Sequence, residues 1–228
     1  MITLESIVES IKHQLKPYLN DDTRLYDEFI IRMIDDTRAT LIKAVQVSNE
    51  SLTPYYQDYV PTLAAWRNGD DEYMYSEFAL PSRLMSNVGR KNIQNINVDN
   101  LIFSSLDFHY CTYEEFMAYS NHVYGKDAVR ICNYGDKVLL YHEKFEDGPD
   151  ILFRGIFETP SVLPDYDYKT SSYPVSASIL RQLEIVTFQH IAVKLGMPAD
   201  VVNNGYDETK NAQVPQQKQQ RQSNQEGE

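Results

Sequence analysis

The residues that could carry out chemistry are few and widely separated. Asp165 and Asp167, in the stretch DYDY, form a possible corner of a metal site, because carboxylates are typical ligands of divalent cations. The stretch lies between Pro164 and Pro174, however, and a solvated loop is the favoured interpretation. Asp35 and Asp36 fall on the polar side of an amphipathic segment, where we predict a solvated helix face. Neither pair indicates a catalytic site by itself.

Histidines and cysteines follow no metal-ligand spacing. Four of the five histidines are scattered between residues 109 and 190: His109, His122, His142 and His190. His190 belongs to a largely apolar segment, so we expect a hydrogen-bonded histidine of the core or of an interface. For Cys111 and Cys132 we expect two free, half-buried thiols, with a disulfide as the alternative.

Motifs that bind phosphate, activate a serine or hold zinc are not found. The sequence contains no Gly-rich phosphate loop, no G-x-S-x-G, no H-E-x-x-H and no Cys/His zinc spacing. We therefore predict a protein that is not an enzyme and has no catalytic residues, cofactor or metal.

Charge and tyrosine content favour a protein partner over a nucleic acid. The net charge of −12 argues against binding DNA by neutralising its phosphates, although an acidic surface can face DNA that slides past. The 17 tyrosines are suited to protein interfaces, because each combines a large rigid contact area with a polar tip. Three of them lie in TPYYQDYVP, residues 53–61, which we predict to be an exposed loop. Half-buried strand tyrosines are the alternative.

The first residues and the hydropathy indicate the compartment. No apolar run approaches the roughly 20 residues that a membrane span needs. The opening stretch MITLESIVESIKHQLK has helical periodicity and two glutamates, unlike a signal peptide. We expect a protein that is made and kept in a cytoplasm-like compartment.

Apolar periodicity predicts three helices, over residues 2–16, 26–47 and 176–196. The first two are joined by a short loop and should be antiparallel. The third begins at a plausible N-cap, Ser176, and ends at Gly196.

Between the helices, the pattern is typical of strands. We predict strands at 72–81, 92–98 and 150–160, a hairpin at 129–142 around NYGD, and a short helix at 112–125. The fold class is therefore α+β: a helical bundle that carries a small antiparallel β-sheet. Its body spans 1–205, with a β-rich insertion at 72–158.

The last part of the sequence, residues 206–228, is predicted to be an extended C-terminal arm. Seven of its last eighteen residues are Gln, and so few apolar side chains cannot offset the entropy of ordering the segment alone. We expect it to order only against other chains. Val214 and Pro215 would be its apolar anchor, and Lys218 and Arg221 would contact an acidic or polar groove.

The order of segments resembles a known family. Four stretches follow one another along the chain: YDEFIIRMIDDTRATLIKA near the start, YGDKVLLYH and ILFRGIFETP in the middle, and YPVSASILRQLEIV later. This order is similar to that of virion ring proteins of crAss-like bacteriophages and, more broadly, of head-to-tail connector (adaptor) proteins of short-tailed phages. The resemblance covers about residues 1–200 and is most specific from Arg154 to Pro160 and from Ser176 to Gly196.

The resemblance implies a structural role in the virion, at the portal and tail. Such adaptors form rings, typically of twelve subunits, that connect the capsid portal to the tail and surround the DNA exit channel. Expected partners are further copies of this chain, the portal protein, another ring or a tail-barrel protein, and genomic DNA that passes without tight binding. Two alternatives stay open: a non-viral protein-interaction module, and a small metal-dependent hydrolase that uses DYDY.

Overall fold

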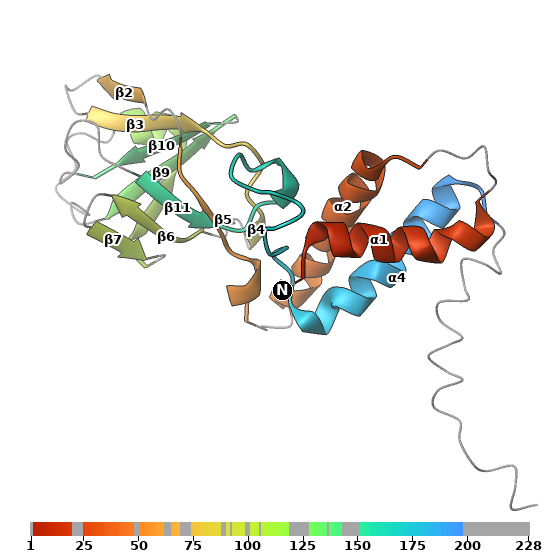
Figure 1. Cartoon of the computed structure of the whole chain (residues 1–228). Helices are drawn as coiled ribbons and strands as arrows, with labels where there is room; N and C mark the ends of the chain where they lie inside the picture. The colour runs from red at the N-terminus through yellow and green to blue at the C-terminus, as the bar shows by residue number, and fades with distance from the viewer. Residues whose placement is uncertain are drawn as a thin grey trace, which may run out of the picture.

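The protein is elongated, with helices at one end and sheets at the other (Figure 1). The computed structural model describes residues 2–19, 25–47, 51–61, 65–68, 74–87, 90–91, 93–98, 101–104, 106–118, 128–135, 137–142 and 151–197. The predicted arm 206–228, with Val214, Pro215, Lys218 and Arg221, lies outside these residues. The α+β class is confirmed.

Three long helices form the bundle: α1 at Leu4–Leu15, α2 at Asp27–Val47 and α4 at Ala177–Lys194. Their positions agree with the apolar periodicity. Thr3 caps α1 by accepting a hydrogen bond from the Ser6 amide at 3.2 Å. After α4, Gly196 takes φ of +68°, and the Met197 amide reaches back to the Ala192 carbonyl at 2.9 Å.

The bundle has its own apolar core. α1 and α4 begin beside the sheets, where the Tyr173 amide donates to the Ile2 carbonyl at 2.8 Å, and α2 runs back toward the same place (Figure 1). The side chains buried between the helices are mostly aliphatic, including Leu4, Ile7, Ile11, Ile30, Ile34, Ile42, Leu183 and Ile191. Burial of this stripe is what holds the helices together, since helix propensity alone is weak.

Two main sheets form the other end. The antiparallel four-stranded sheet has the order β1 (Gln57–Tyr59), β11 (Ile151–Gly155), β6 (Ile93–Val98) and β7 (Leu101–Ser104). The five-stranded sheet has the order β2 (Ala65–Asn68), β3 (Met74–Ala79), β10 (Lys137–Tyr141), β9 (Val129–Tyr134) and β8 (Phe108–Cys111). Two short strands, β4 (Ser86–Asn87) and β5 (Arg90–Lys91), pair separately.

The two main sheets bury a common core. Phe78, Val138 and Leu140 of the five-stranded sheet share one apolar cluster with Ile96 and Phe153 of the four-stranded sheet. Alternate residues of each strand therefore point into a sandwich. The helix α3, Tyr113–Ala118, packs Phe116 against Tyr75, Cys132 and Leu139 on the opposite face of the five-stranded sheet.

The prediction of one small antiparallel sheet was wrong in two respects. There are two main sheets, and β8 pairs with β9 in parallel. The connection from β8 to β9 contains α3, and a connection of that length allows the chain to return to the end where β8 began. The hairpin at 129–142 is confirmed as β9 and β10, with Gly135 at φ of +66° in the turn. Of the predicted helix 112–125, residues 119–125 lie outside the described part.

The prediction of an exposed tyrosine loop at 53–61 was also wrong. Residues Thr53–Tyr55 form a short 3-10 helix, and β1 follows directly. Tyr55 is 1% exposed and Tyr59 8% exposed, so two of the three tyrosines belong to the core. β1 pairs with β11, a strand almost a hundred residues away along the chain. No local pattern reveals such a partner.

Candidate functional site

The polar face of α2 is buried where the bundle meets the sheets. Asp35 was expected on a solvated helix face but is 1% exposed, and Arg38, about one helical turn later, is fully buried. The expectation failed because the segment from β11 to α4 lies over this side of α2. Asp36 is exposed, as predicted.

Arg38 donates hydrogen bonds to backbone carbonyls of three separate segments. Its Nε donates to the Pro174 carbonyl at 2.7 Å, and its two terminal nitrogens donate to the carbonyls of Phe157 at 2.9 Å and Tyr55 at 3.3 Å. The guanidinium also lies 5.8 Å from the centre of the Tyr173 ring. A planar, permanently charged group with several fixed donors is suited to this arrangement.

Asp35 completes the buried network one helical turn earlier. Its two carboxylate oxygens accept hydrogen bonds from Ser161 Oγ at 2.5 Å and from the Tyr173 hydroxyl at 2.7 Å. Burial raises the pKa of the Asp35 carboxyl, while these hydrogen bonds and the charge of Arg38 oppose the rise. The Tyr55 hydroxyl lies 2.8 Å from Ser176 Oγ, immediately before α4.

This network can fix geometry but offers no open site for a ligand. Arg38, Asp35, Tyr55 and Tyr173 are all shielded from solvent. Their hydrogen bonds join α2 to the chain before β1, after β11 and before α4. We call this group of four residues the junction network. It holds the bundle and the sandwich in one orientation.

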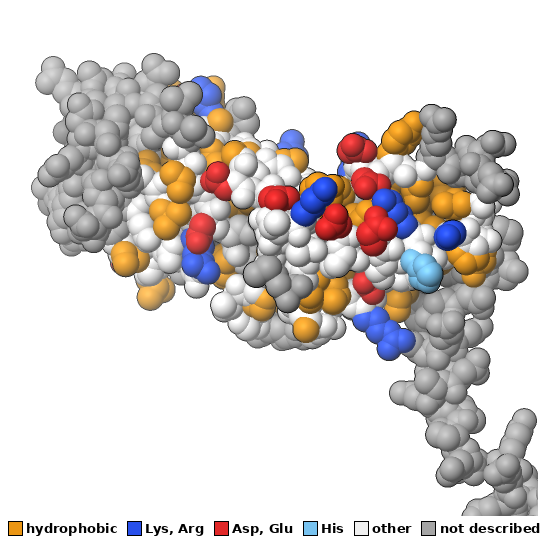
Figure 2. Space-filling model, viewed as in Figure 1, with side chains coloured by type: hydrophobic (Ala, Val, Ile, Leu, Met, Phe, Trp, Pro, Cys, Tyr) orange, Lys and Arg blue, Asp and Glu red, His pale blue; other side chains and the backbone are white. Residues whose placement is uncertain are grey.

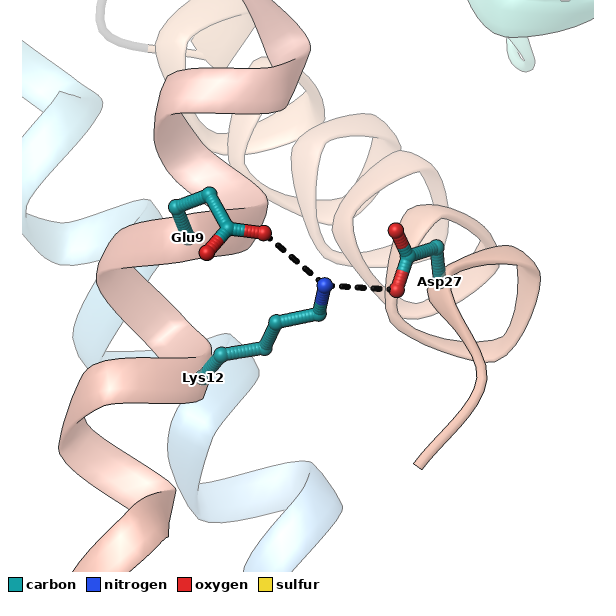
Figure 3. Close-up of polar contacts among 3 residues, drawn as sticks. All are labelled: Glu9, Lys12 and Asp27. Atoms are coloured by element: carbon teal, nitrogen blue, oxygen red, sulfur yellow. Dashed lines mark hydrogen bonds and ion pairs between the residues drawn. The ribbon is translucent and has the colours of Figure 1, made fainter. Parts of the chain in front are cut away.

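A smaller polar cluster joins the surfaces of α1 and α2 (Figure 3). Lys12 Nζ lies 2.8 Å from Glu9 Oε1 and 2.7 Å from Asp27 Oδ1. The hydrogen bond with Asp27 is the main reason that the pKa of Lys12 is raised, followed by the one with Glu9. These side chains are partly exposed, so solvent screens the pairs and they add little stability.

The stretch DYDY forms a turn. Asp167 accepts hydrogen bonds from the Lys169 amide at 3.0 Å and from Thr170 Oγ1 at 2.7 Å, and these contacts lower the pKa of its carboxyl. Asp165 is exposed. Within the described ranges, no group of three or more His, Cys, Asp and Glu residues is placed to hold a metal ion.

The cysteines and histidines are mostly structural. Cys111 and Cys132 occupy paired positions of β8 and β9 as free thiols, as expected, and burial raises the pKa of Cys111 to about 12. His190 Nδ1 lies 3.3 Å from Thr37 Oγ1, so the expected hydrogen bond is present, but the side chain is exposed and does not belong to the core. His142 is buried with its ring 4.8 Å from that of Phe103. His122 lies outside the described residues.

Large apolar side chains reach the surface at both ends of the molecule. Beside the free ends of the helices these are Tyr18, Tyr26, Val193 and Leu195. On the sandwich they include Ile102 and Leu106, which are 72% and 93% exposed, and Tyr113 and Tyr134, whose rings stack at 4.5 Å. Figure 2 shows such side chains over the helices as well as over the sheets. Exposed tyrosines and aliphatic residues favour protein contacts.

Comparison with known proteins does not add a family to these observations. Neither a scan against models of protein families nor a search of curated proteins found a match to this chain. Function is therefore inferred from the residues and the architecture. None of the described helices combines the length and the apolar character needed to cross a membrane.

Proposed function

We propose that this chain is a structural, non-enzymatic virion protein. It would form a ring at the junction of portal and tail, connect the capsid portal to the tail, and line the DNA exit channel. The order of segments over about residues 1–200 supports this proposal from the sequence. In the structure, the observation that carries it is a body of fixed shape with different apolar residues exposed at its two ends.

Different surfaces on one body favour heterologous contacts. A surface that contacts a different surface of the next copy builds a closed ring when the rotation between copies closes, whereas a self-complementary surface gives a dimer. Closure requires the same angle in every copy. The junction network supplies that constraint, because Arg38 ties the bundle to the chain segments that lead into and out of the sandwich.

The charge agrees with a channel that lets DNA pass. With a net charge of −12, the chain has no excess of cations for neutralising phosphates. The proposed location is the virion, after synthesis in the cytoplasm of the bacterial host. Portal protein, another ring or a tail-barrel protein would be the neighbours.

The mass of the assembled protein tests ring formation. We expect sedimentation of a particle of about twelve times the 26.4 kDa chain, and rings in electron micrographs of the same sample. Binding in a closed ring is cooperative, so intermediate sizes should be scarce. A protein that stays monomeric at all accessible concentrations contradicts the proposal. That outcome favours the non-viral interaction module, with Tyr113 and Tyr134 as its contact surface.

Removing residues 206–228 should separate folding from attachment. We expect the melting temperature of the isolated subunit to be unchanged, because the arm has too few apolar side chains to contribute to a core. Binding to the portal or to the adjacent ring should weaken, and infectious particles should become rare. Differential scanning calorimetry and a pull-down with portal protein measure the two effects. A large fall in melting temperature would mean that the arm packs on its own body.

A further inference from the structure

A half-open groove of about 560 Å³ lies at the end of the five-stranded sheet that faces the bundle. One wall is the chain that leads from β3 toward β4, residues 80–84, and the other is formed by Asn133, Gly135 and Lys137. Lys137 pairs with Ala79 in the sheet, which places the turn beside the end of β3. Figure 1 shows the chain running from β3 toward β4 between the sheets and the helices.

Arg83 gives this groove an exposed cation. Ser82 and Leu84 are buried and Arg83 is exposed, as expected for an extended segment with alternating side chains. Its backbone is held in place, because the Arg83 carbonyl accepts from the Glu158 amide at 2.8 Å and Ser82 Oγ accepts from the Thr159 amide at 2.9 Å. Among the described residues, no carboxylate forms an ion pair with Arg83.

The rest of the lining is suited to a peptide. Leu80, Pro81 and Leu84 provide apolar surface, and Asn133 supplies an exposed amide opposite them. Gly135, at φ of +66°, has no side chain, and nothing lies within 4 Å of the position a Cβ would take, so a ligand backbone can approach closely. Lys137 adds a second cation, which is paired with Glu77 at 2.5 Å.

We propose that this groove binds the acidic end of the arm, residues 222–228, from a neighbouring copy. Small-molecule sites bury most of their ligand, whereas a half-open groove suits an extended segment that continues beyond it. Arg83 would pair with Glu226 or Glu228, and Gly227 between them adds no side chain to the segment.

The length of the chain permits this contact between copies. The described residues end at Met197, beyond the end of α4 that is distant from the sheets. Residues 198–222 could span at most about 80 Å when extended, enough to reach the sandwich of an adjacent subunit. The assignment to a neighbour rests on the proposed ring, but the binding of the segment to the groove does not.

A labelled peptide tests the groove directly. The probe is QSNQEGE, residues 222–228, and the receiver is the full chain with Glu226→Gln and Glu228→Gln, so that its own arm does not compete. Fluorescence anisotropy should show saturable binding. Arg83→Ala in the receiver should weaken it about tenfold or more, since a charge-assisted hydrogen bond is lost. Arg181→Ala removes an exposed arginine of α4 and should leave the affinity unchanged.

The outcomes separate the sources of the ligand. A peptide with both glutamates replaced by glutamine should not bind, and equal binding of that peptide overturns the proposal. The proposal is also overturned if short duplex DNA displaces the probe with the same dependence on Arg83, because the groove would then be a phosphate-binding site. Loss of binding in Arg83→Ala supports the proposal only if this receiver keeps its melting temperature. The peptide without glutamates tests the same ion pair and leaves the receiver unchanged.

Cross-linking distinguishes a neighbour from the same chain. Copies with Asn133→Cys, at the groove, are mixed with copies with Ser223→Cys, in the arm, and oxidised after assembly, so that Arg83 and both glutamates are retained. A product of two chains is expected, and each variant alone is the control. A double variant that links only within one chain overturns the assignment to a neighbour. If the peptide binds but rings never form, the ring proposal fails and the proposal that the groove binds the arm is retained. If rings form but the peptide does not bind, only the groove proposal fails.

Discussion

Arg38→Ala is expected to lower the free energy of unfolding by about 3–5 kcal/mol. The substitution leaves the carbonyls of Tyr55, Phe157 and Pro174 without their donor in a region closed to water. It also leaves the buried Asp35 carboxyl without its nearby cation, although Ser161 and Tyr173 still donate to it. Buried polar groups without partners are among the largest single sources of instability.

Denaturant unfolding of the isolated subunit measures this effect. Arg32→Ala is the matched control, because Arg32 is an exposed arginine one and a half turns earlier on α2 and should change stability by less than about 0.5 kcal/mol. Arg38→Lys should also destabilise, since one ammonium group cannot reproduce a planar set of donors to three carbonyls. Equal stability of the Arg38 and Arg32 variants would contradict the role of the junction network.

Leu183→Asp is expected to prevent folding, and with it assembly. Leu183 is fully buried on α4 in the core between the three helices. An aspartate there would place an unpaired carboxylate in apolar surroundings, which costs several kcal/mol even after its pKa rises to keep it neutral. That cost is comparable to the total stability of many domains. We expect insoluble protein or a subunit that does not enter rings.

Two further variants distinguish the effect of a buried charge from the effect of changing this part of α4. Gln182→Asp changes the preceding, exposed residue and should leave the protein soluble and assembled. Leu183→Ala keeps an apolar side chain and should cost about 2–5 kcal/mol, so the subunit folds with a lower melting temperature. Solubility, circular dichroism and electron microscopy of the three variants provide the comparison. Normal rings from Leu183→Asp would mean that α4 does not pack as described.

The three long helices could be predicted because their determinants are local. An apolar stripe at helical spacing is read within each segment, Thr3 caps the start of α1, and Gly196 follows the end of α4, where Ser176 makes no side-chain capping bond at the start. Ile30, Ile34 and Leu41 are buried as the periodicity indicated. Leu183 is fully buried within α4, whereas Leu195, which follows the last residue of this helix, is 38% exposed.

Strands were predicted better than their pairing. The hairpin of β9 and β10 has a short local turn, so its register follows from its sequence. The pairing of β1 with β11, and of β8 with β9 in parallel, depends on contacts between distant segments. A pattern of period two shows that a strand has two different faces. It does not show which strand lies next to it or how many sheets form.

The sequence alone determined the α+β class, the helices, the hairpin and the acidic, tyrosine-rich character of this protein. Only the tertiary structure decided which polar residues are buried and which cation lines a groove. Asp35 and Arg38 follow the same local pattern as exposed Asp36 and Arg32. The carbonyls that accept from Arg38 belong to residues that are separated from it by 17, 119 and 136 positions in the sequence. Burial of a charge depends on such distant partners, because only complete hydrogen bonding offsets the loss of water.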